Sequence, residues 1–203
     1  MVSIPDIFKA FRKIIGTLIS NIYTPLAKVL FYLNGAKIGS GLKVCGKINV
    51  HITRRGIVFI GKNCTINSEN YNLIGRQQKS IFWVEGKLSI GDNLGLSCSA
   101  IICNHEMEIG NNVTIGGNTV IYDTDFHSLD PDLRLSKKSD KINAKWGKVS
   151  IGDQVFIGAH TTILKGVTIG ENSIIGACSL VVNDIPSNEI WGGNPAKYLG
   201  KIG

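Results

Sequence analysis

The chain contains 203 residues, enough for one domain with a sizeable core. Glycine is frequent, with 24 residues, and aromatic residues account for only 7%, which favours tight turns and stacked aliphatic side chains over a globule centred on aromatic packing. The formal net charge is +7, so the composition favours anionic partners: a phosphorylated cofactor, a membrane surface or nucleic acid. No stretch of about 20 uncharged apolar residues is present, which argues against a membrane-spanning helix.

The cysteines and the N-terminal residues predict a cytoplasmic protein. The apolar residues at the N-terminus are interrupted by Lys9, Arg12 and Lys13, unlike the continuous apolar core of a secretory signal. The five cysteines contain no C-x-x-C pair and are interpreted as buried free thiols of a reducing compartment. They are Cys45, Cys64, Cys98, Cys103 and Cys178.

Residues 1–35 are predicted to form an amphipathic helical segment, because apolar residues recur on one face of a helix. Ser3 is expected to cap this helix, with Asp6 three residues later. Thr24-Pro25 is predicted to break it, with a second short helix reaching Asn34-Gly35. The apolar stripe consists of Ile4, Ile7, Phe8, Phe11, Ile14, Ile15, Leu18, Ile19 and Ile22.

Two interpretations of this segment stay open. The stripe can pack on the rest of the chain or on a neighbouring subunit, as such stripes usually do. Alternatively, the basic amphipathic surface can lie on the inner face of a membrane as a peripheral contact.

From about residue 38 the chain repeats every six residues. Aliphatic residues lead the successive units, glycine is common in the second slot, and small or β-branched residues fill the fifth. A period of six does not match the 3.6 residues per turn of a helix, whereas a short strand with a two-residue corner fits it. The repeat therefore predicts an all-β solenoid in which equivalent residues stack from coil to coil. The leading residues are Ile38, Val44 and Val50; Ile90, Leu96 and Ile102; Ile109, Ile115 and Ile121; and Ile151, Ile157, Ile163, Ile169, Ile175 and Val181.

The repeat stops inside "IYDTDFHSLDP", residues 121–131. Asp125 occupies a slot that is otherwise small, and His127 stands where the next aliphatic residue is due. Residues 127–148 are polar, basic and without strong periodicity, so we expect a loop extruded from the solenoid, where function commonly resides.

The residues at the break suit proton transfer. A histidine can accept a proton near neutral pH, and a neighbouring carboxylate can orient it and stabilise the imidazolium. In an extended segment Asp123, Asp125 and His127 would project from the same side, with about 7 Å between successive positions. We prefer Asp125 over Asp123 as the partner of His127, and the choice between them stays open.

The run "IGDQVFIGAHTTILKGVTIGENSIIGACSLVVNDIPSNEIWGGNPAKYLG" resembles the hexapeptide-repeat acyltransferases, in the sugar and polysaccharide O-acetyltransferase branch related to maltose and galactoside acetyltransferases. The resemblance covers roughly residues 36–201. It implies a left-handed parallel β-helix over residues 36–203, with the loop 127–148 and a C-terminal tail at 186–203. It also implies homotrimers whose sites are shared between two subunits.

The resemblance implies an acetyltransferase that uses acetyl-CoA as co-substrate. "DTDFHSLD" matches the family motif in which the histidine is the general base, so His127 would deprotonate a hydroxyl of a sugar or polysaccharide precursor. The oxygen would attack the thioester directly, without a covalent enzyme intermediate. Trp146 and Trp83 could stack on a sugar ring. The residues expected to contact the cofactor are Gly158, Ala159, Lys165, Gly176, Ala177, Asn194, Pro195, Ala196 and Lys197.

Rival functions are weighed against this interpretation. A serine, an antibiotic or an amino sugar would undergo the same chemistry, and fold does not settle the acceptor. A zinc enzyme of the γ-class carbonic anhydrase type needs a His-x4-His pair, which the four histidines do not form, so we expect no metal. A non-catalytic solenoid would leave the loop unexplained, and basic residues are not interleaved with aromatic ones as in single-strand nucleic-acid binders.

Overall fold

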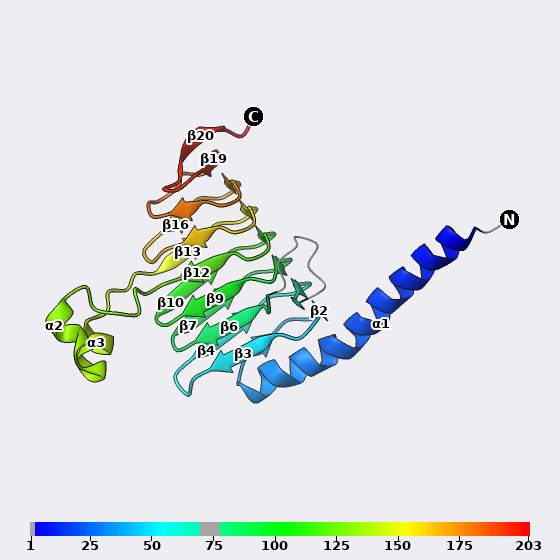
Figure 1. Cartoon of the computed structure of the whole chain (residues 1–203), viewed down its shortest axis with the longest axis horizontal. Helices are drawn as coiled ribbons and strands as arrows, with labels where there is room; N and C mark the ends of the chain where they lie inside the picture. Colours follow the sequence, from blue (N-terminus) through cyan, green and yellow to red (C-terminus); the bar gives the residue numbers. More distant parts are fainter. Residues whose placement is uncertain (1–2, 70–77) are drawn as a thin grey trace.

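The computed structural model describes residues 3–69 and 78–203, apart from the side chains at positions 12, 13, 16, 17, 19 and 20. The side chain of Ile19, which belongs to the predicted stripe, is therefore outside the described part of the structure. The chain winds into stacked coils with the N-terminal helix at one end and the C-terminal hairpin at the other (Figure 1). The fold is the predicted left-handed parallel β-helix.

Three sheets form the sides of the β-helix, and all their strands pair in parallel except the last two strands of sheet B, which are antiparallel. Sheet A contains β1 (Lys37–Ile38), β4 (Ile57–Ile60), β7 (Lys87–Ile90), β10 (Glu106–Ile109), β13 (Val149–Ile151) and β16 (Thr168–Ile169). Sheet B contains β2 (Lys43–Cys45), β5 (Thr65–Asn67), β8 (Gly95–Ser97), β11 (Thr114–Ile115), β14 (Phe156–Ile157), β17 (Ile174–Ile175), β19 (Glu189–Gly192) and β20 (Lys197–Lys201). Sheet C contains β3 (Asn49–Ile52), β6 (Ile81–Val84), β9 (Ala100–Cys103), β12 (Val120–Tyr122), β15 (Thr162–Ile163) and β18 (Leu180–Val181).

The core consists of one column of apolar side chains per sheet, as the six-residue period predicted. In sheet A, Ile90, Ile109 and Ile151 pair in register, and all three are buried. The register differs from the prediction at one position, because Ile121 pairs with Ile101 and not with Ile102. Ile101 is fully buried while Ile102 is partly exposed. Ile101 comes five residues after Leu96, the core residue of β8, so the six-residue spacing fails in that unit.

The N-terminal segment is one continuous helix, α1 (Ile4–Leu33), and the predicted break at Thr24-Pro25 is wrong. The Thr24 hydroxyl accepts a hydrogen bond from the Val44 N–H at 2.9 Å, so this turn is tied to the first coil. Phe31 is fully buried and packs edge-on against Phe82, with 5.4 Å between ring centroids. These contacts offset the cost of about 3 kcal/mol that a proline imposes inside a helix.

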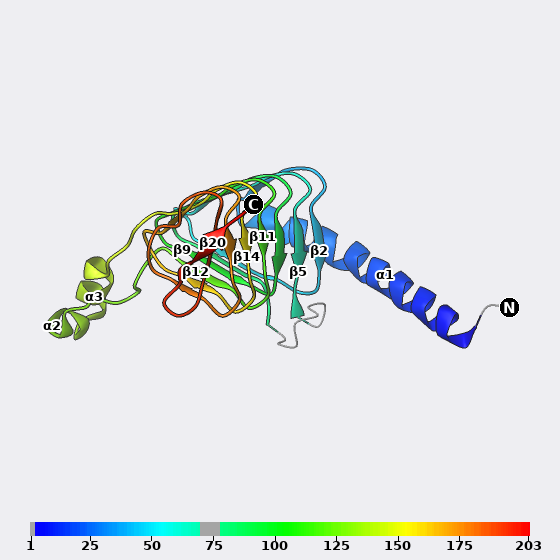
Figure 2. The same cartoon turned by 90° about the horizontal axis from the view of Figure 1, so that it is seen from above.

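Both ends of α1 have the predicted caps. Ser3 and Asp6 form the expected capping box at the N-terminus. At the other end, Asn34 is the C-cap, and Gly35 adopts a φ of 78° that glycine tolerates readily. The N-terminal part of α1 extends beyond the coils, so only its last turns cover the open end of the solenoid (Figures 1 and 2).

Two further predictions concern the burial of the cysteines and the lack of a membrane-spanning helix. All five thiols are free, but Cys178 is exposed and Cys45 is partly exposed, contrary to the prediction that all are buried. Burial is the largest cause that raises the pKa of Cys64 and of Cys103. Among the described residues, no helix combines the length and the apolar character needed to cross a membrane.

Candidate active site

The extruded loop leaves the solenoid after β12 and returns beside its own exit. The Asp125 N–H donates to the Lys145 carbonyl at 2.9 Å, and the Gly147 N–H donates to the Asp123 carbonyl at 3.0 Å. Between them, Thr124 and Trp146 form an isolated antiparallel bridge. The loop is therefore closed at its base, and it carries two short helices, α2 (Pro131–Arg134) and α3 (Lys137–Asn143), away from the coils (Figure 2).

Asp123 is fully buried and holds the corner of the adjacent coil. Its carboxylate accepts hydrogen bonds from the backbone N–H groups of Asn104, His105 and Glu106, at 2.8, 2.7 and 2.9 Å. These three hydrogen bonds engage both oxygens and replace the water that burial removes from the carboxylate. Asp123 therefore holds the backbone of residues 104–106 in place and does not contact His127.

Asp125 is also directed away from His127. Its Oδ1 lies 2.6 Å from the Lys165 Nζ, in a partly buried ion pair that links the loop exit to the coil of β15. Phe126 then adopts a φ of 63°, and the His127 N–H donates to the Asp125 carbonyl at 2.7 Å. This tight turn ends the extended geometry, so the predicted same-face arrangement of Asp123, Asp125 and His127 is wrong.

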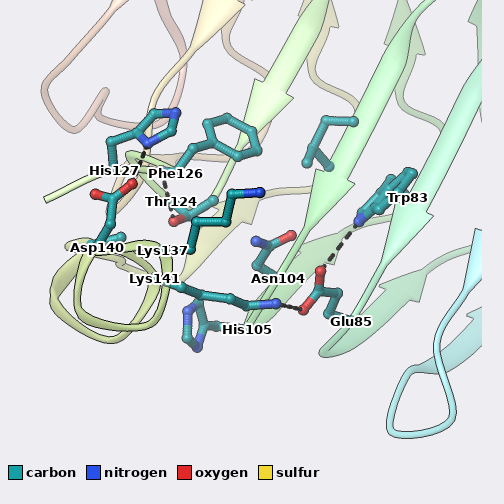
Figure 3. A pocket seen from close by; sticks show the side chains of 12 residues that line it. Trp83, Glu85, Asn104, His105, Thr124, Phe126, His127, Lys137, Asp140 and Lys141 are labelled. Carbon is teal, nitrogen blue, oxygen red and sulfur yellow. Dashed lines mark hydrogen bonds and ion pairs between the residues drawn. The ribbon is translucent and has the colours of Figure 1, made fainter. Parts of the chain in front are cut away.

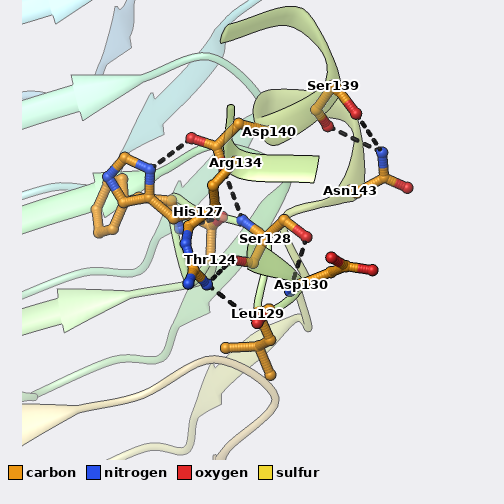
Figure 4. Close-up of polar contacts among 10 residues, drawn as sticks. Thr124, His127, Ser128, Leu129, Asp130, Arg134, Ser139, Asp140 and Asn143 are labelled. Atoms are coloured by element: carbon orange, nitrogen blue, oxygen red, sulfur yellow. Dashed lines mark hydrogen bonds and ion pairs between the residues drawn. The ribbon is translucent and has the colours of Figure 1, made fainter. Parts of the chain in front are cut away.

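The carboxylate that contacts the histidine is Asp140 of α3. His127 Nδ1 lies 2.7 Å from Asp140 Oδ2, and the Ser128 N–H donates to Asp140 Oδ1 at 2.7 Å (Figure 4). The hydrogen bond from His127, followed by that from Ser128, holds the pKa of the Asp140 carboxyl below its usual value. An ionised carboxylate only accepts hydrogen bonds, so this contact places a proton on Nδ1, and in the neutral form of the ring the lone pair is then on Nε2.

Further polar contacts shape the start of the loop. Asp130 caps α2 by accepting the Asp132 N–H at 2.9 Å. The Arg134 guanidinium donates to the carbonyls of Ser128 and Leu129, at 2.8 and 3.0 Å (Figure 4). These bonds fold the backbone after His127 back on itself and fix the position of its ring relative to Asp140.

A cavity of about 610 Å³ lies between the loop and sheet C, and His127 is part of its wall (Figure 3). Its size falls in the range of small-molecule sites. The coils contribute an apolar and aromatic wall, and α3 contributes two lysines. The lining residues include Trp83, Ile102, Asn104, His105, Phe126, Lys137 and Lys141.

Two polar features of this cavity were not anticipated from the sequence. Lys141 reaches across from α3 to Glu85 at 2.9 Å, which joins the loop to the coil of β6 (Figure 3). Asn104 Oδ1 is buried without a hydrogen-bond partner. Trp146, in contrast, stacks on His105 with 4.4 Å between centroids and is not among the cavity-lining residues, so of the two candidate tryptophans only Trp83 lines the cavity.

The residues expected to contact the cofactor occupy both ends of one strand. Gly158 and Ala159 precede β15, and Lys165 follows it. Gly176 and Ala177 occupy the equivalent corner one coil further along, because Gly158 stacks on Ala177. Within one chain, therefore, the small residues lie at the opposite end of β15 from Lys165, Asp125 and the extruded loop.

The C-terminal residues of the expected cofactor set adjoin the small-residue corner. The Ala196 N–H donates to the Leu180 carbonyl at 2.8 Å, which holds the tail against β18. Ala196 is buried, whereas its three neighbours in the motif are exposed and therefore accessible: Asn194, Pro195 and Lys197.

Gly158 and Gly176 differ in how much space the neighbouring coil leaves for a side chain. A Cβ at Gly158 would collide with the backbone of Ala177, so coil stacking alone requires glycine there. A Cβ at Gly176 would meet nothing closer than 3.6 Å, which is an ordinary contact. The small size of residue 176 is thus not explained by packing within the chain.

Among the described residues, no group of three or more His, Cys, Asp or Glu side chains is arranged to hold a metal ion. The geometry of His127 places a candidate general base at the wall of the cavity.

Comparison with known proteins identifies the repeat. Residues 148–183 match the model of the bacterial transferase hexapeptide (six repeats) family. The chain is 38% identical over 143 residues to the galactoside O-acetyltransferase of Lactococcus lactis, covering 70% of this chain and 62% of the relative. It is 33% identical over 129 residues to the galactoside O-acetyltransferase of Escherichia coli, covering 59% and 61%. These matches thus span less than two thirds of the length of either relative.

Solved structures show the same fold. A variant of AntD, an N-acyltransferase from Bacillus cereus in complex with dTDP-4-amino-4,6-dideoxyglucose and coenzyme A, matches with a TM-score of 0.60, 24% identity and coverage of 81% of this chain and 82% of AntD. The hexapeptide-repeat acetyltransferase VCA0836 of Vibrio cholerae, complexed with acetyl coenzyme A, matches with a TM-score of 0.55, 22% identity and coverage of 89% and 78%. Residues 148–183 thus contain the bacterial transferase hexapeptide repeat, the chain is similar in sequence to these acetyltransferases, and it shares the fold of the two solved structures.

Proposed function

We propose that this protein is an O-acetyltransferase that transfers an acetyl group from acetyl-CoA to a hydroxyl of a sugar or polysaccharide precursor. The observation that carries the proposal is the contact of His127 Nδ1 with Asp140 at 2.7 Å, which leaves Nε2 free at the wall of a cavity of about 610 Å³. The galactoside O-acetyltransferases among the relatives support a sugar hydroxyl as the acceptor.

The proposed reaction is a direct transfer in a ternary complex. Nε2 of His127 accepts the hydroxyl proton while the acceptor oxygen bonds to the thioester carbonyl carbon. The C–S bond then breaks, and the imidazolium returns the proton to the departing thiolate. Asp140 remains ionised throughout, fixes the tautomer of His127 and stabilises the positive charge that the ring acquires. Asp125 takes no part in the proton transfer, because its carboxylate is engaged by Lys165.

Binding of acetyl-CoA is assigned to the corner that includes Gly176 and Ala177, the tail residues Asn194–Lys197, and Lys165. Lys197 is exposed and suits a phosphate contact, while Gly176 leaves room for the neutral arm of the cofactor. Calorimetric titration with acetyl-CoA tests this assignment. We expect binding in the micromolar range that weakens in Lys197→Ala, and no binding at millimolar ligand would contradict the proposal.

A homotrimer is part of the same proposal. Within one chain the cofactor candidates lie at opposite ends of β15, away from one another, so a second copy that presents its small-residue corner to the loop of the first would complete the site. Light scattering on the purified protein tests this arrangement. A monomer at micromolar concentration would contradict it.

We further propose a cytoplasmic protein whose helix α1 lies on the inner surface of a membrane. The support is the long apolar face of α1, whose described residues are exposed, alongside the exposed Lys9. Polysaccharide precursors carried on lipids would be within reach of a protein held at this surface. The apolar face includes Ile4, Ile7, Phe8, Phe11, Ile14, Leu18, Ile22, Leu26 and Val29.

The catalytic proposal is tested by incubating the protein with acetyl-CoA and a panel of saccharides, while free thiol is measured and products are identified by mass. We expect His127→Ala to lower turnover by about 100-fold or more, because the general base is lost. Acetyl-CoA affinity should change little. Equal turnover in wild type and His127→Ala would remove His127 from the mechanism.

A further inference from the structure

A second cavity adjoins the one that contains His127. It has a volume of about 510 Å³ and is lined by Thr53, Arg54 and Arg55 together with Glu85, Asn104 and His105. The last three residues line both cavities, so the two cavities lie next to each other. We call the two adjoining cavities together the corner groove, and define it by residues 53–55, 85, 104–105, 124, 126 and 127.

The corner groove crosses the ends of four strands. Its residues follow β3, β6, β9 and β12, which are successive neighbours in sheet C. Neighbouring strands are about 4.8 Å apart, so the Arg54 end lies about 14 Å from the Thr124 end. A ligand that reaches from His127 to Arg54 must therefore be longer than one sugar ring.

The charges in the corner groove do not balance. Glu85 is paired with Lys141 at 2.9 Å, and this contact is the main reason that the pKa of its carboxyl is lowered. Arg54, Arg55 and Lys137 take part in none of the ion pairs among the described residues. Unpaired cations that line a cavity create a positive potential, which favours an anionic ligand.

The middle of the groove offers groups that suit a saccharide. Asn104 Oδ1 is a buried acceptor without a partner, and its backbone is held in place by Asp123 at 2.8 Å. A hydroxyl that donates to this oxygen would remove the cost of leaving it unpaired. Trp83 adds an aromatic surface that is 41% exposed, and Figure 3 shows Lys137 and Lys141 extending from α3 over this region.

We propose that the corner groove binds an acceptor in which the reacting sugar is joined to an anionic group more than one sugar ring away, with the reacting hydroxyl at His127 and the anionic group at Arg54 and Arg55. This inference rests on the proposed function and names its substrate class. The shared chemistry is an anion attached to a saccharide, either a carboxylate of an acidic polymer or a phosphate that links the sugar to a nucleotide or lipid.

Calorimetry with matched probes tests the inference. The acidic probes are a galacturonic acid trimer and UDP-galactose, and the neutral probes are maltotriose and galactose. At a salt concentration of about 20 mM we expect at least one acidic probe to bind about tenfold more tightly than its neutral counterpart, with the difference shrinking as salt is added. Preference for the trimer indicates a polymer carboxylate, and preference for UDP-galactose indicates a phosphate.

Two double variants locate the effect. Arg54→Ala with Arg55→Ala should abolish the preference for the acidic probe. Lys43→Ala with Lys62→Ala removes the same charge from β2 and from the turn between β4 and β5, where neither lysine lines the groove, and should leave the preference unchanged. The inference is overturned if acidic and neutral probes bind equally, if no probe binds, or if both double variants behave alike.

The outcome is separable from that of the proposed function. Acetyl-CoA turnover without any preference for acidic probes would overturn only the substrate class. Arginine-dependent binding of an acidic probe without acetyl transfer, tested with acetyl-CoA present, would leave the groove assignment in place and contradict the catalytic proposal.

Discussion

His127 Nδ1 and Asp140 Oδ2 are 2.7 Å apart, although 13 positions separate them in the sequence and both belong to the loop extruded from the β-helix. The candidate base and the group that orients it are therefore carried by the same loop, while the coils supply the wall that they face. This pairing assigns different roles to the aspartates around the break, and those roles can be separated by mutation.

Asp140→Asn should lower kcat by about 10- to 100-fold with little change in KM, because the amide no longer fixes the tautomer of His127 or stabilises the imidazolium. Asp125→Asn is the matched variant, since it alters a carboxylate that contacts Lys165 and not His127. Steady-state kinetics with acetyl-CoA and an accepted saccharide measures both. A larger loss of kcat in Asp125→Asn than in Asp140→Asn would contradict the assignment.

Asp123→Ala should destabilise the fold by about 3 kcal/mol or more, because three backbone N–H groups would lose the buried carboxylate that they share. Urea unfolding followed by circular dichroism measures the change. Asp130→Ala provides a comparison, since it removes an exposed cap of the short helix α2 and should cost about 1 kcal/mol or less. A similar loss of unfolding free energy in the two variants would mean that Asp123 does not stabilise the backbone of residues 104–106.

Gly158→Ala and Gly176→Ala add the same methyl group at equivalent corners of adjacent coils. Gly158→Ala should destabilise the protein by about 1–3 kcal/mol, because the added Cβ meets the backbone of Ala177. Gly176→Ala should fold normally and bind acetyl-CoA more weakly. Thermal unfolding and calorimetry separate the two effects, and unchanged affinity in Gly176→Ala would remove this corner from the cofactor site.

The lowered pKa of Asp140 predicts that this residue stabilises the fold at neutral pH and loses that effect in acid. A carboxyl whose pKa is depressed in the folded state stabilises the fold above its ordinary value, here 3.8, and loses this effect as the pH falls through the lower folded value. The difference in Tm between wild type and Asp140→Asn should be constant from pH 7 to about pH 5 and should shrink toward about pH 3.

Asp153→Asn is the control for this measurement. The hydrogen bond from the Asn111 N–H is the main cause that lowers the pKa of Asp153, so the same acid window is expected for its effect on Tm. Asp153 lies in a corner remote from the loop, and its substitution should leave kcat unchanged. A difference in Tm for Asp140→Asn that grows on acidification would have the wrong sign for the proposed contact.

Helix α1 should bind vesicles that contain anionic lipid. Phe8→Glu with Phe11→Glu places charge on the apolar face and should abolish co-flotation with such vesicles, whereas Lys9→Gln should only weaken it. Acetyl-CoA affinity should be unaffected in both variants, because α1 contacts only the first coils. Equal flotation of wild type and the Phe8/Phe11 variant would contradict the membrane assignment.

The periodic part of the sequence determined the architecture. Every coil needs an aliphatic residue at the same place, so a one-dimensional repeat of six specifies both the strands and their stacking, as Ile109, Ile115 and Ile121 illustrate. The point at which the loop leaves the coils was predictable for the same reason, because Asp125 and His127 stand where the six-residue repeat requires a small and an aliphatic residue. Local rules also specified the caps of α1, because Ser3, Asp6 and Gly35 act within a few residues of their own positions.

Only the tertiary structure decided which side chains meet at the site. The partner of His127 is Asp140, which no periodicity connects to it, and the turn at Phe126, with its positive φ, removes His127 from the expected alignment with Asp125. Pro25 remains helical because Phe31 and Thr24 are anchored to other coils, and such contacts override local propensity. Sequence determines what repeats or acts locally, whereas a loop without a period is positioned by contacts that exist only once the chain has folded.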